Sequence, residues 1–287
     1  LISNIFMTTG PWTAGVKAIR RSLDEGISPP EQRWDLLRDL FLLLQRASRF
    51  EEADICVKQA QEISHQLDDP QKMYSALSQK ARLLIGQGLL KQGHACFLEA
   101  VDIAQAANLH ERFWVALSNA AFIAIEIGLL EEGLRHLQQP IPDQETGNMR
   151  IQGAIFCHYG RYNYALGRLT KARTFYEKSL ENAHTYGDNL MEAVVLGRLG
   201  ELELDQGNLK RARVKLESSI DMIMGSIPSH ARRVQGTLAL VHAKAGDLAQ
   251  AQKILDSALS SPGGFLWPTD RVMLYLRDAQ VQHLCGD

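Results

Sequence analysis

The sequence predicts an all-α solenoid built from repeated pairs of antiparallel helices. Three observations support this fold class: apolar residues follow helical spacing throughout, strand-like alternation does not occur, and a similar segment returns about every 40 residues. The helical spacing is clear at Leu77, Ala81 and Leu84, which lie at positions i, i+4 and i+7. One such unit cannot bury its apolar face alone, so neighbouring units must stack into a continuous core.

A small residue follows the start of the second helix in each predicted pair. These residues lie 39 or 40 positions apart and are Ala53, Gly93, Gly133, Ala172, Ala212 and Ala251. Two helices approach closely only where such a side chain is small. Leucine at any of these positions should therefore cost about 1–3 kcal/mol through overpacking.

A turn precedes each small residue by five positions. The turn residues are Ser48, Gly88, Gly128, Gly167, Gly207 and Gly246. Glycine ends a helix well because it enters the left-handed conformation without a Cβ penalty. We therefore expect each first helix to end at this position.

The predicted solenoid runs through the whole chain as one domain, residues 1–287. A half repeat at 1–28 precedes six repeats at about 29–68, 69–108, 109–148, 149–187, 188–227 and 228–266, and a half repeat follows at 267–287. Helix starts are expected at Pro29-Pro30, at Asp68-Asp69-Pro70 and after Tyr186-Gly187-Asp188. Both ends fall within repeats, so we expect a piece of a longer protein.

Two features depart from a regular array. The second helix of the third repeat begins near Glu131 and should stop before Pro140 and Pro142, with a loop through Gly147, because proline cannot continue a helix. The terminal helices lack their partners. Their apolar residues should therefore be exposed and favour self-association through the solenoid ends; these are Trp12, Val16, Ile19, Leu274 and Leu276.

The stretch from Ile155 to Leu180 resembles one tetratricopeptide repeat. It carries Gly160, the turn glycine Gly167, Ala172 and Tyr176 in the order of that family. The eleventh place of the first helix is polar in three repeats, so the chain is most similar to the long-period variants of about 40 residues; these residues are Asn163, Glu203 and His242.

The resemblance implies a right-handed superhelix with a concave groove lined by the first helices. It also implies a scaffold or adaptor that binds a protein or peptide segment. The alternative is the regulatory or sensor arm of a bacterial multidomain signalling protein or transcription activator, which binds an effector or an inhibitory partner.

Composition excludes several other function classes. Apolar residues make up 45% of the chain, charged residues 22%, and the net charge of −2 favours neither a nucleic acid nor an anionic membrane as partner. The four cysteines contain no CxxC pair, and no signal sequence opens the chain, so we expect a cytoplasmic protein. Catalytic motifs are absent from the sequence. We expect no enzyme activity, no cofactor and no metal.

The candidate binding residues follow from the ninth place of each first helix, which faces the groove in this family. The series is Leu42, Arg82, Phe122, Arg161, Glu201 and Leu240. Helix stacking should place Arg82 and Arg161 about 20 Å apart with Phe122 between them. The predicted ligand is an extended segment with acidic groups near both ends and an apolar anchor. Asn119, Tyr164 and Arg198 complete the candidate set.

Two alternatives limit this assignment. Arg82 and Arg161 could instead be solvated or paired with acids such as Glu126. The acids Glu201, Glu203 and Asp205 are spaced by two residues, which places them on different faces of one helix, so they do not form a metal or catalytic set.

Overall fold

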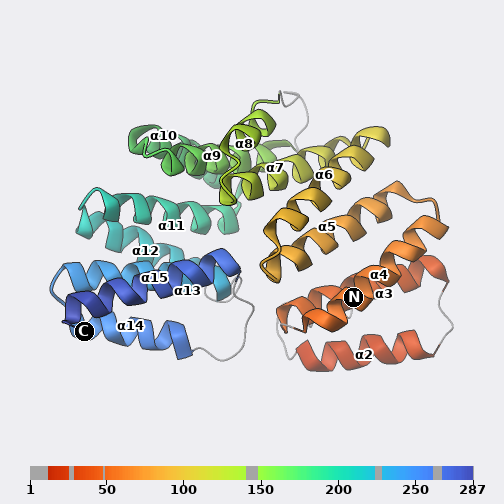
Figure 1. Cartoon of the computed structure of the whole chain (residues 1–287), viewed down its shortest axis with the longest axis horizontal. Coiled ribbons are helices and arrows are strands. Elements are labelled where there is room, and N and C mark those ends of the chain that lie inside the picture. The colour runs from red at the N-terminus through yellow and green to blue at the C-terminus, as the bar shows by residue number, and fades with distance from the viewer. Residues whose placement is uncertain are drawn as a thin grey trace. The chain divides into compact units, whose positions relative to one another are not determined.

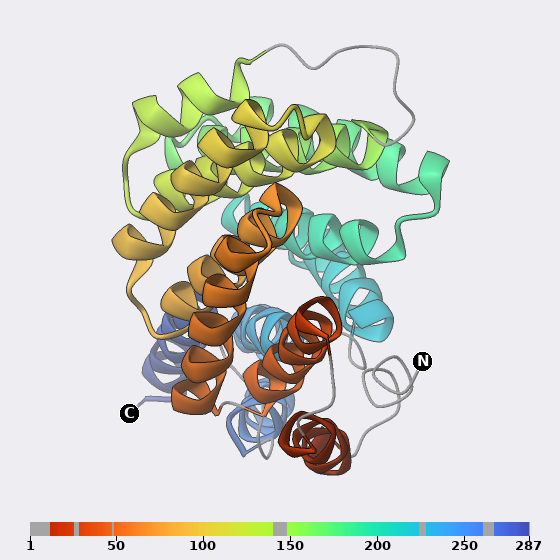
Figure 2. The same ribbon diagram turned by 90° about the vertical axis from the view of Figure 1, so that its right-hand side faces the viewer.

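The computed structural model describes residues 12–25, 29–47, 49–139, 148–223, 228–260 and 267–286. Within these ranges every regular element is an α-helix (Figures 1 and 2). The described chain divides into two compact units, one ending at Ile123 and one beginning at Ala124. The predicted fold class, all-α with paired helices, is confirmed.

The first unit contains α2 to α6 and most of α7. The bounds are α2 (Trp12–Asp24), α3 (Pro30–Arg46), α4 (Phe50–Gln66), α5 (Pro70–Gly86), α6 (Leu90–Ala106) and α7 (His110–Glu126). The pairs α3–α4 and α5–α6 each pack closely. Their core is formed by the apolar faces of α2 to α5, with Trp34, Phe41 and Leu44 fully or almost fully buried.

The second unit contains the C-terminal part of α7 and the helices α8 to α15. The bounds are α8 (Leu130–Leu137), α9 (Asn148–Ala165), α10 (Leu169–Tyr186), α11 (Asn189–Asp205), α12 (Leu209–Ile223), α13 (Pro228–Lys244), α14 (Leu248–Ser260) and α15 (Pro268–Cys285). The closest helix pairs are α9–α10 and α11–α12, and α13 packs against both α14 and α15 (Figure 1).

The helix boundaries follow the predicted sequence signals. Pro30 is the first residue of α3, and the Asp69 carboxylate accepts hydrogen bonds from the backbone N–H groups of Gln71 and Lys72 at the start of α5. Asp188 caps α11 in the same way. These aspartates satisfy N–H groups that have no partner within the helix.

The turn glycines adopt the predicted left-handed conformation. Their φ angles lie between 69° and 88° at Gly88, Gly128, Gly167, Gly207 and Gly246. Ser48, the sixth predicted turn residue, lies outside the described residues. A residue with a Cβ would be strained at these turns, because the left-handed region is unfavourable for it.

At Gly160, α9 and α10 approach so closely that a side chain has no room. A Cβ placed there would lie 2.4 Å from Cδ1 of Tyr176, whose ring is buried between α9 and α10. All six predicted small residues at the starts of the second helices are buried as well. The prediction that small residues allow close helix packing is confirmed.

The irregular third pair is also confirmed where it is described. Helix α8 has only 8 residues and ends at Leu137, before Pro140. The predicted loop through Gly147 lies outside the described residues. The short helix α8 packs less extensively against α9 than α4 packs against α5 or α10 against α11.

The terminal helices correct one expectation. Val16 and Ile19 are buried in the core formed with α3, and Leu274 is buried beside Gly236 of α13. A lone helix still packs against the neighbouring pair through one face, which the prediction overlooked. Leu276 is exposed as expected, together with Val272 and Tyr275 on α15. The side chain of Trp12 lies outside the described residues.

Candidate partner-binding face

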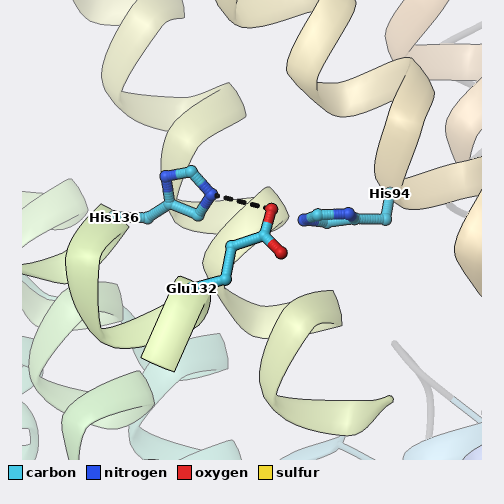
Figure 3. Close-up of side chains that lie close together, drawn as sticks. All are labelled: His94, Glu132 and His136. Atoms are coloured by element: carbon cyan, nitrogen blue, oxygen red, sulfur yellow. Dashed lines mark ion pairs between the residues drawn. The ribbon is translucent and has the colours of Figure 1, made fainter. Parts of the chain in front are cut away.

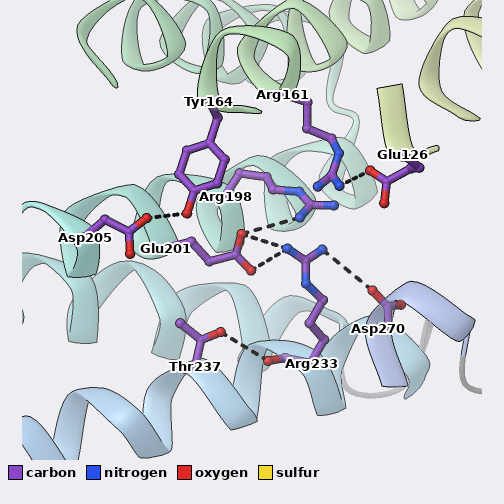
Figure 4. A network of polar contacts seen from close by, with 9 residues as sticks. All are labelled: Glu126, Arg161, Tyr164, Arg198, Glu201, Asp205, Arg233, Thr237 and Asp270. Carbon is purple, nitrogen blue, oxygen red and sulfur yellow. Dashed lines mark hydrogen bonds and ion pairs between the residues drawn. The ribbon is translucent and has the colours of Figure 1, made fainter. Parts of the chain in front are cut away.

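A cluster of charged side chains lies among the first helices of the second unit. It draws residues from α7, α9, α11, α13 and α15 (Figure 4), and we call it the charged cluster. Its members are Glu126, Arg161, Arg198, Glu201, Arg233, Asp270 and Arg277. The repeat places them together: Arg161 and Glu201 are one period apart, and Glu201 lies one turn after Arg198 on α11.

Glu201 is the centre of the charged cluster. Both of its carboxylate oxygens accept hydrogen bonds from Nη2 of Arg233, at 2.6 and 2.7 Å. Nη1 of Arg198 makes a longer contact of 3.4 Å with Oε2. Burial raises the pKa of Glu201, although Arg198, Arg161 and Arg277 oppose that shift. Burial therefore dominates the charge balance at this position.

Arg161 forms an ion pair with Glu126, the last residue of α7. Burial, together with the positive charge of Arg198, lowers the pKa of Arg161 to about 10. The alternative weighed from the sequence, pairing with Glu126, is therefore correct for Arg161. The predicted role of Arg161 in a groove stays a prediction.

Arg198 and Arg233 differ in how well their charges are paired. Arg233 contacts Glu201 at hydrogen-bond distance and Asp270 at 3.6 Å. Arg198 has only the 3.4 Å contact with Glu201, and its Nε is buried without a partner among the described residues. Burial lowers the pKa of Arg198, but Glu201 and the other acidic groups outweigh this, so the pKa is raised overall.

Two further side chains frame the charged cluster in Figure 4. The Tyr164 hydroxyl donates a hydrogen bond to Asp205, and the Thr237 hydroxyl donates one to the backbone oxygen of Arg233. Burial raises the pKa of Tyr164, so its hydroxyl stays protonated at neutral pH. Tyr164 is half-buried and Asp205 is exposed, so this pair lies at the rim of the charged cluster.

The predicted residues of the first unit lie on two helices. Arg82 is exposed on α5, while Asn119 and Phe122 are half-buried on α7. The expected spacing of Arg82 and Arg161 stays a prediction.

The sequence reasoning missed three members of the charged cluster. Arg233, Asp270 and Arg277 were not among the candidates, although each is more than nine-tenths buried. One signal was available, because Glu201 stands in an apolar run between Gly200 and Leu202 and a buried carboxylate requires a cation. Nothing in the sequence indicated which helix would supply it.

The three acids of α11 behave as their spacing predicted. Glu201 pairs with Arg233 of α13, Glu203 accepts from Arg173 of α10 and from Asn208, and Asp205 accepts from Tyr164 of α9. Their carboxylates are therefore bound to different helices. The spacing of two residues therefore places the three acids against different neighbouring helices.

An ion pair outside the charged cluster lies within α8. Nε2 of His136 lies 3.7 Å from Oε1 of Glu132, one turn earlier on the same helix (Figure 3). Such i, i+4 pairs contribute a few tenths of a kcal/mol when they are partly exposed. Among the described residues, no helix combines the length and apolar character needed to cross a bilayer.

Residues 152–223 match the family model described as Tetratricopeptide repeat. This range covers α10 and α11, nearly all of α9, and α12 to its end. No curated protein matches the chain. The assignment to the long-period variants stays a prediction.

Solved structures resemble the chain in fold at low sequence identity. The Rap conjugation gene regulator of the plasmid pLS20, in complex with the Phr* peptide, has a TM-score of 0.63 at 16% identity, over 95% of this chain and 71% of that one. A Rap protein complexed with Competence and Sporulation Factor has a TM-score of 0.61 at 12% identity, over 91% and 78%.

A third solved structure is the signal transduction ATPase with a tetratricopeptide repeat sensor from Pyrococcus horikoshii. Its TM-score is 0.58 at 16% identity, and the similarity covers 98% of this chain and 41% of that one. These likenesses concern the α-α superhelix fold. The family model covers residues 152–223, and the solved structures share the α-α superhelix fold over most of the chain.

Proposed function

We propose that this protein-interaction repeat domain binds an extended segment of a partner protein along the first helices of its repeats. The proposed contact residues are Arg161, Tyr164 and Arg198 in the second unit, and Arg82, Asn119 and Phe122 in the first. The charged cluster carries the proposal, because it gathers charged groups from four first helices and from α15 on one face of the second unit. Such a face suits an extended polar segment better than a small substrate.

Two of the fold neighbours support a peptide as the ligand. One of these Rap proteins is in complex with the Phr* peptide and the other with Competence and Sporulation Factor. The fold alone does not identify a partner, so the proposal for this chain rests on its own residues. Exposed Arg82 and the rim residue Tyr164 offer groups that an incoming segment reaches first.

The test begins with a displayed library of random peptides selected on the purified 287-residue chain. The affinity of a selected peptide is then measured for the double variant Arg82→Glu with Arg161→Glu. We expect weaker binding and a flatter salt dependence, because two attractive charges become repulsive. The matched control is Lys210→Glu with Arg213→Glu on α12, which carries exposed cations away from the charged cluster.

Circular dichroism must show that both double variants are folded. Equal affinity of the double variant and the unaltered chain would refute binding at these residues. Equal weakening in the α12 control would mean that only the net charge matters.

The second candidate function is a regulatory or sensor arm of a larger signalling protein. The observation in its favour is the fold match over nearly the whole chain to the signal transduction ATPase with a tetratricopeptide repeat sensor. A neighbouring ATPase or DNA-binding module in the encoding gene would support this function. Its absence from the full reading frame would leave the adaptor function.

A further inference from the structure

The charged cluster contains more positive than negative charge. Four guanidinium groups belong to it, those of Arg161, Arg198, Arg233 and Arg277. Three buried carboxylates face them among the described residues, those of Glu126, Glu201 and Asp270, which leaves one excess positive charge (4 − 3 = 1). Asp205, the nearby acid at the rim, is exposed and accepts the hydrogen bond of Tyr164.

The excess charge falls on Arg198 and Arg277. Arg233 and Arg161 each have a close carboxylate partner, whereas Arg198 has one contact at 3.4 Å. Nη1 of Arg277 donates a hydrogen bond of 2.8 Å to the neutral side-chain amide of Gln280. Arg277 lies two turns after Asp270 on α15, and Asp270 contacts Arg233, which binds Glu201.

Both arginines are buried and incompletely bonded. Each of the two residues is only 7% exposed, and the Nε of each has no hydrogen-bond partner among the described residues. A buried cation without a full set of acceptors is unfavourable, because the acceptors it had in water are not replaced. Two donors of the second unit therefore lie where a bound acceptor would stabilise the folded unit.

The neighbouring groups do not supply that acceptor. His230 of α13 is buried next to Gly197, and burial lowers its pKa to about 4, so it is neutral at pH 7. The hydroxyl of Tyr164 is already bonded to Asp205. Neither of these two groups is therefore the missing partner, and an acceptor on a bound molecule would satisfy the two arginines.

We propose that Arg198 and Arg277 form a subsite for an oxyanion, a carboxylate or a phosphate group. The planar guanidinium group presents its donors in a fork that matches two oxygens of such an anion. The anion would supply the fourth negative charge of the charged cluster. This subsite rests on the proposed function, since it names the group of the partner that the second unit accepts.

The test uses small anions alone, so it does not depend on a partner. The melting temperature of the full chain is measured at pH 7 in chloride, acetate and phosphate at equal ionic strength. Concentrations stay near 10 mM, where general exclusion of phosphate from the protein surface is weak. We expect at least one oxyanion to raise the Tm by about 2 °C or more over chloride.

Two variants decide where that effect arises. Arg277→Gln and Arg198→Lys should each lose at least half of the increase, the first through loss of charge and the second through loss of the fork. Arg213→Gln is the matched control, because Arg213 is exposed on α12 and paired with Glu217. It should keep the full increase.

Each outcome is decisive. No increase in the unaltered chain, or an equal increase in all variants, overturns the subsite. An increase with phosphate alone identifies a phosphate group, and an increase with acetate as well identifies a carboxylate. Because the peptide measurements change Arg82 and Arg161, failure of the anion test leaves the proposed function standing, and the reverse also holds. If Arg277→Gln does not fold, Arg198→Lys alone decides.

Discussion

Glu201 and Glu203 lie two residues apart on α11, and both are buried, yet their surroundings differ. Glu201 faces α13 and shares its carboxylate between Arg233 and the more distant Arg198. Glu203 faces α10 and accepts hydrogen bonds of 2.7 Å from Arg173 and 2.9 Å from Asn208. The pKa of Glu201 is raised by burial, while that of Glu203 is lowered by the Arg173 hydrogen bond.

The difference shows that a buried acid is not stabilised by nearby cations alone. Three arginines act on Glu201 without overcoming the cost of burying its charge. At Glu203 the hydrogen bonds from Arg173 and Asn208, together with the charges of Arg173 and Arg211, outweigh the cost of burial. The balance between desolvation and the attraction of hydrogen-bonding and charged neighbours decides which form is favoured.

The largest expected effect comes from removing the acceptor oxygens of Glu201. Glu201→Leu leaves Arg233 with only the distant Asp270 and leaves Arg198 without a carboxylate contact. Because both cations are buried, we expect a loss of about 3–5 kcal/mol in the free energy of unfolding, measured by urea denaturation. The matched control, Glu217→Leu in the exposed pair with Arg213, should cost less than about 1 kcal/mol. Similar losses for both variants would contradict the role of burial.

An intermediate effect is expected at Glu203. Glu203→Gln replaces two charge-assisted acceptors by one neutral oxygen, so the free energy of unfolding should fall by about 1.5–3 kcal/mol. Glu177→Gln on α10 is the matched control, because Glu177 is exposed and should change stability by less than about 0.5 kcal/mol. A loss larger than that of Glu201→Leu would reverse the order of the two sites.

The smallest effect is a difference in the pH dependence of stability. The pKa of Glu203 is below its unfolded value of about 4.5, so its contribution is complete above that value and is lost as pH falls through the folded pKa. The pKa of Glu201 is above its unfolded value, so the native state takes up a proton first. Its contribution therefore grows as pH falls through the folded pKa towards 4.5.

Urea unfolding between pH 3 and pH 7 separates the two contributions. Glu203→Gln should lose less stability than the unaltered chain on acidification below about pH 4.5. Glu201→Gln should lack the gain that the unaltered chain shows above that pH. Parallel curves for all three proteins would show that neither carboxylate has a shifted pKa.

The sequence by itself determined the helices and their pairing. The 39- or 40-residue spacing of Ala172, Ala212 and Ala251 and the glycine turns before them predicted where helices end and where they approach closely. These features are local, because each depends on the backbone conformation or side-chain size of a few neighbouring residues. The structure agrees with them at the turn glycines, at the caps and at Gly160.

Only the tertiary structure decided which charges meet. Arg161, Tyr164 and Arg198 were placed on the correct helices, but Arg233, Asp270 and Arg277 come from α13 and α15 and were not foreseen. Their positions depend on the packing of helices that are distant in sequence. The burial of Val16 and Leu274 was missed for the same reason. Periodicity gives the face of a helix, whereas the partner of a buried charge depends on which helix packs against that face, since a hydrogen-bonded ion pair needs its atoms within about 3 Å of each other.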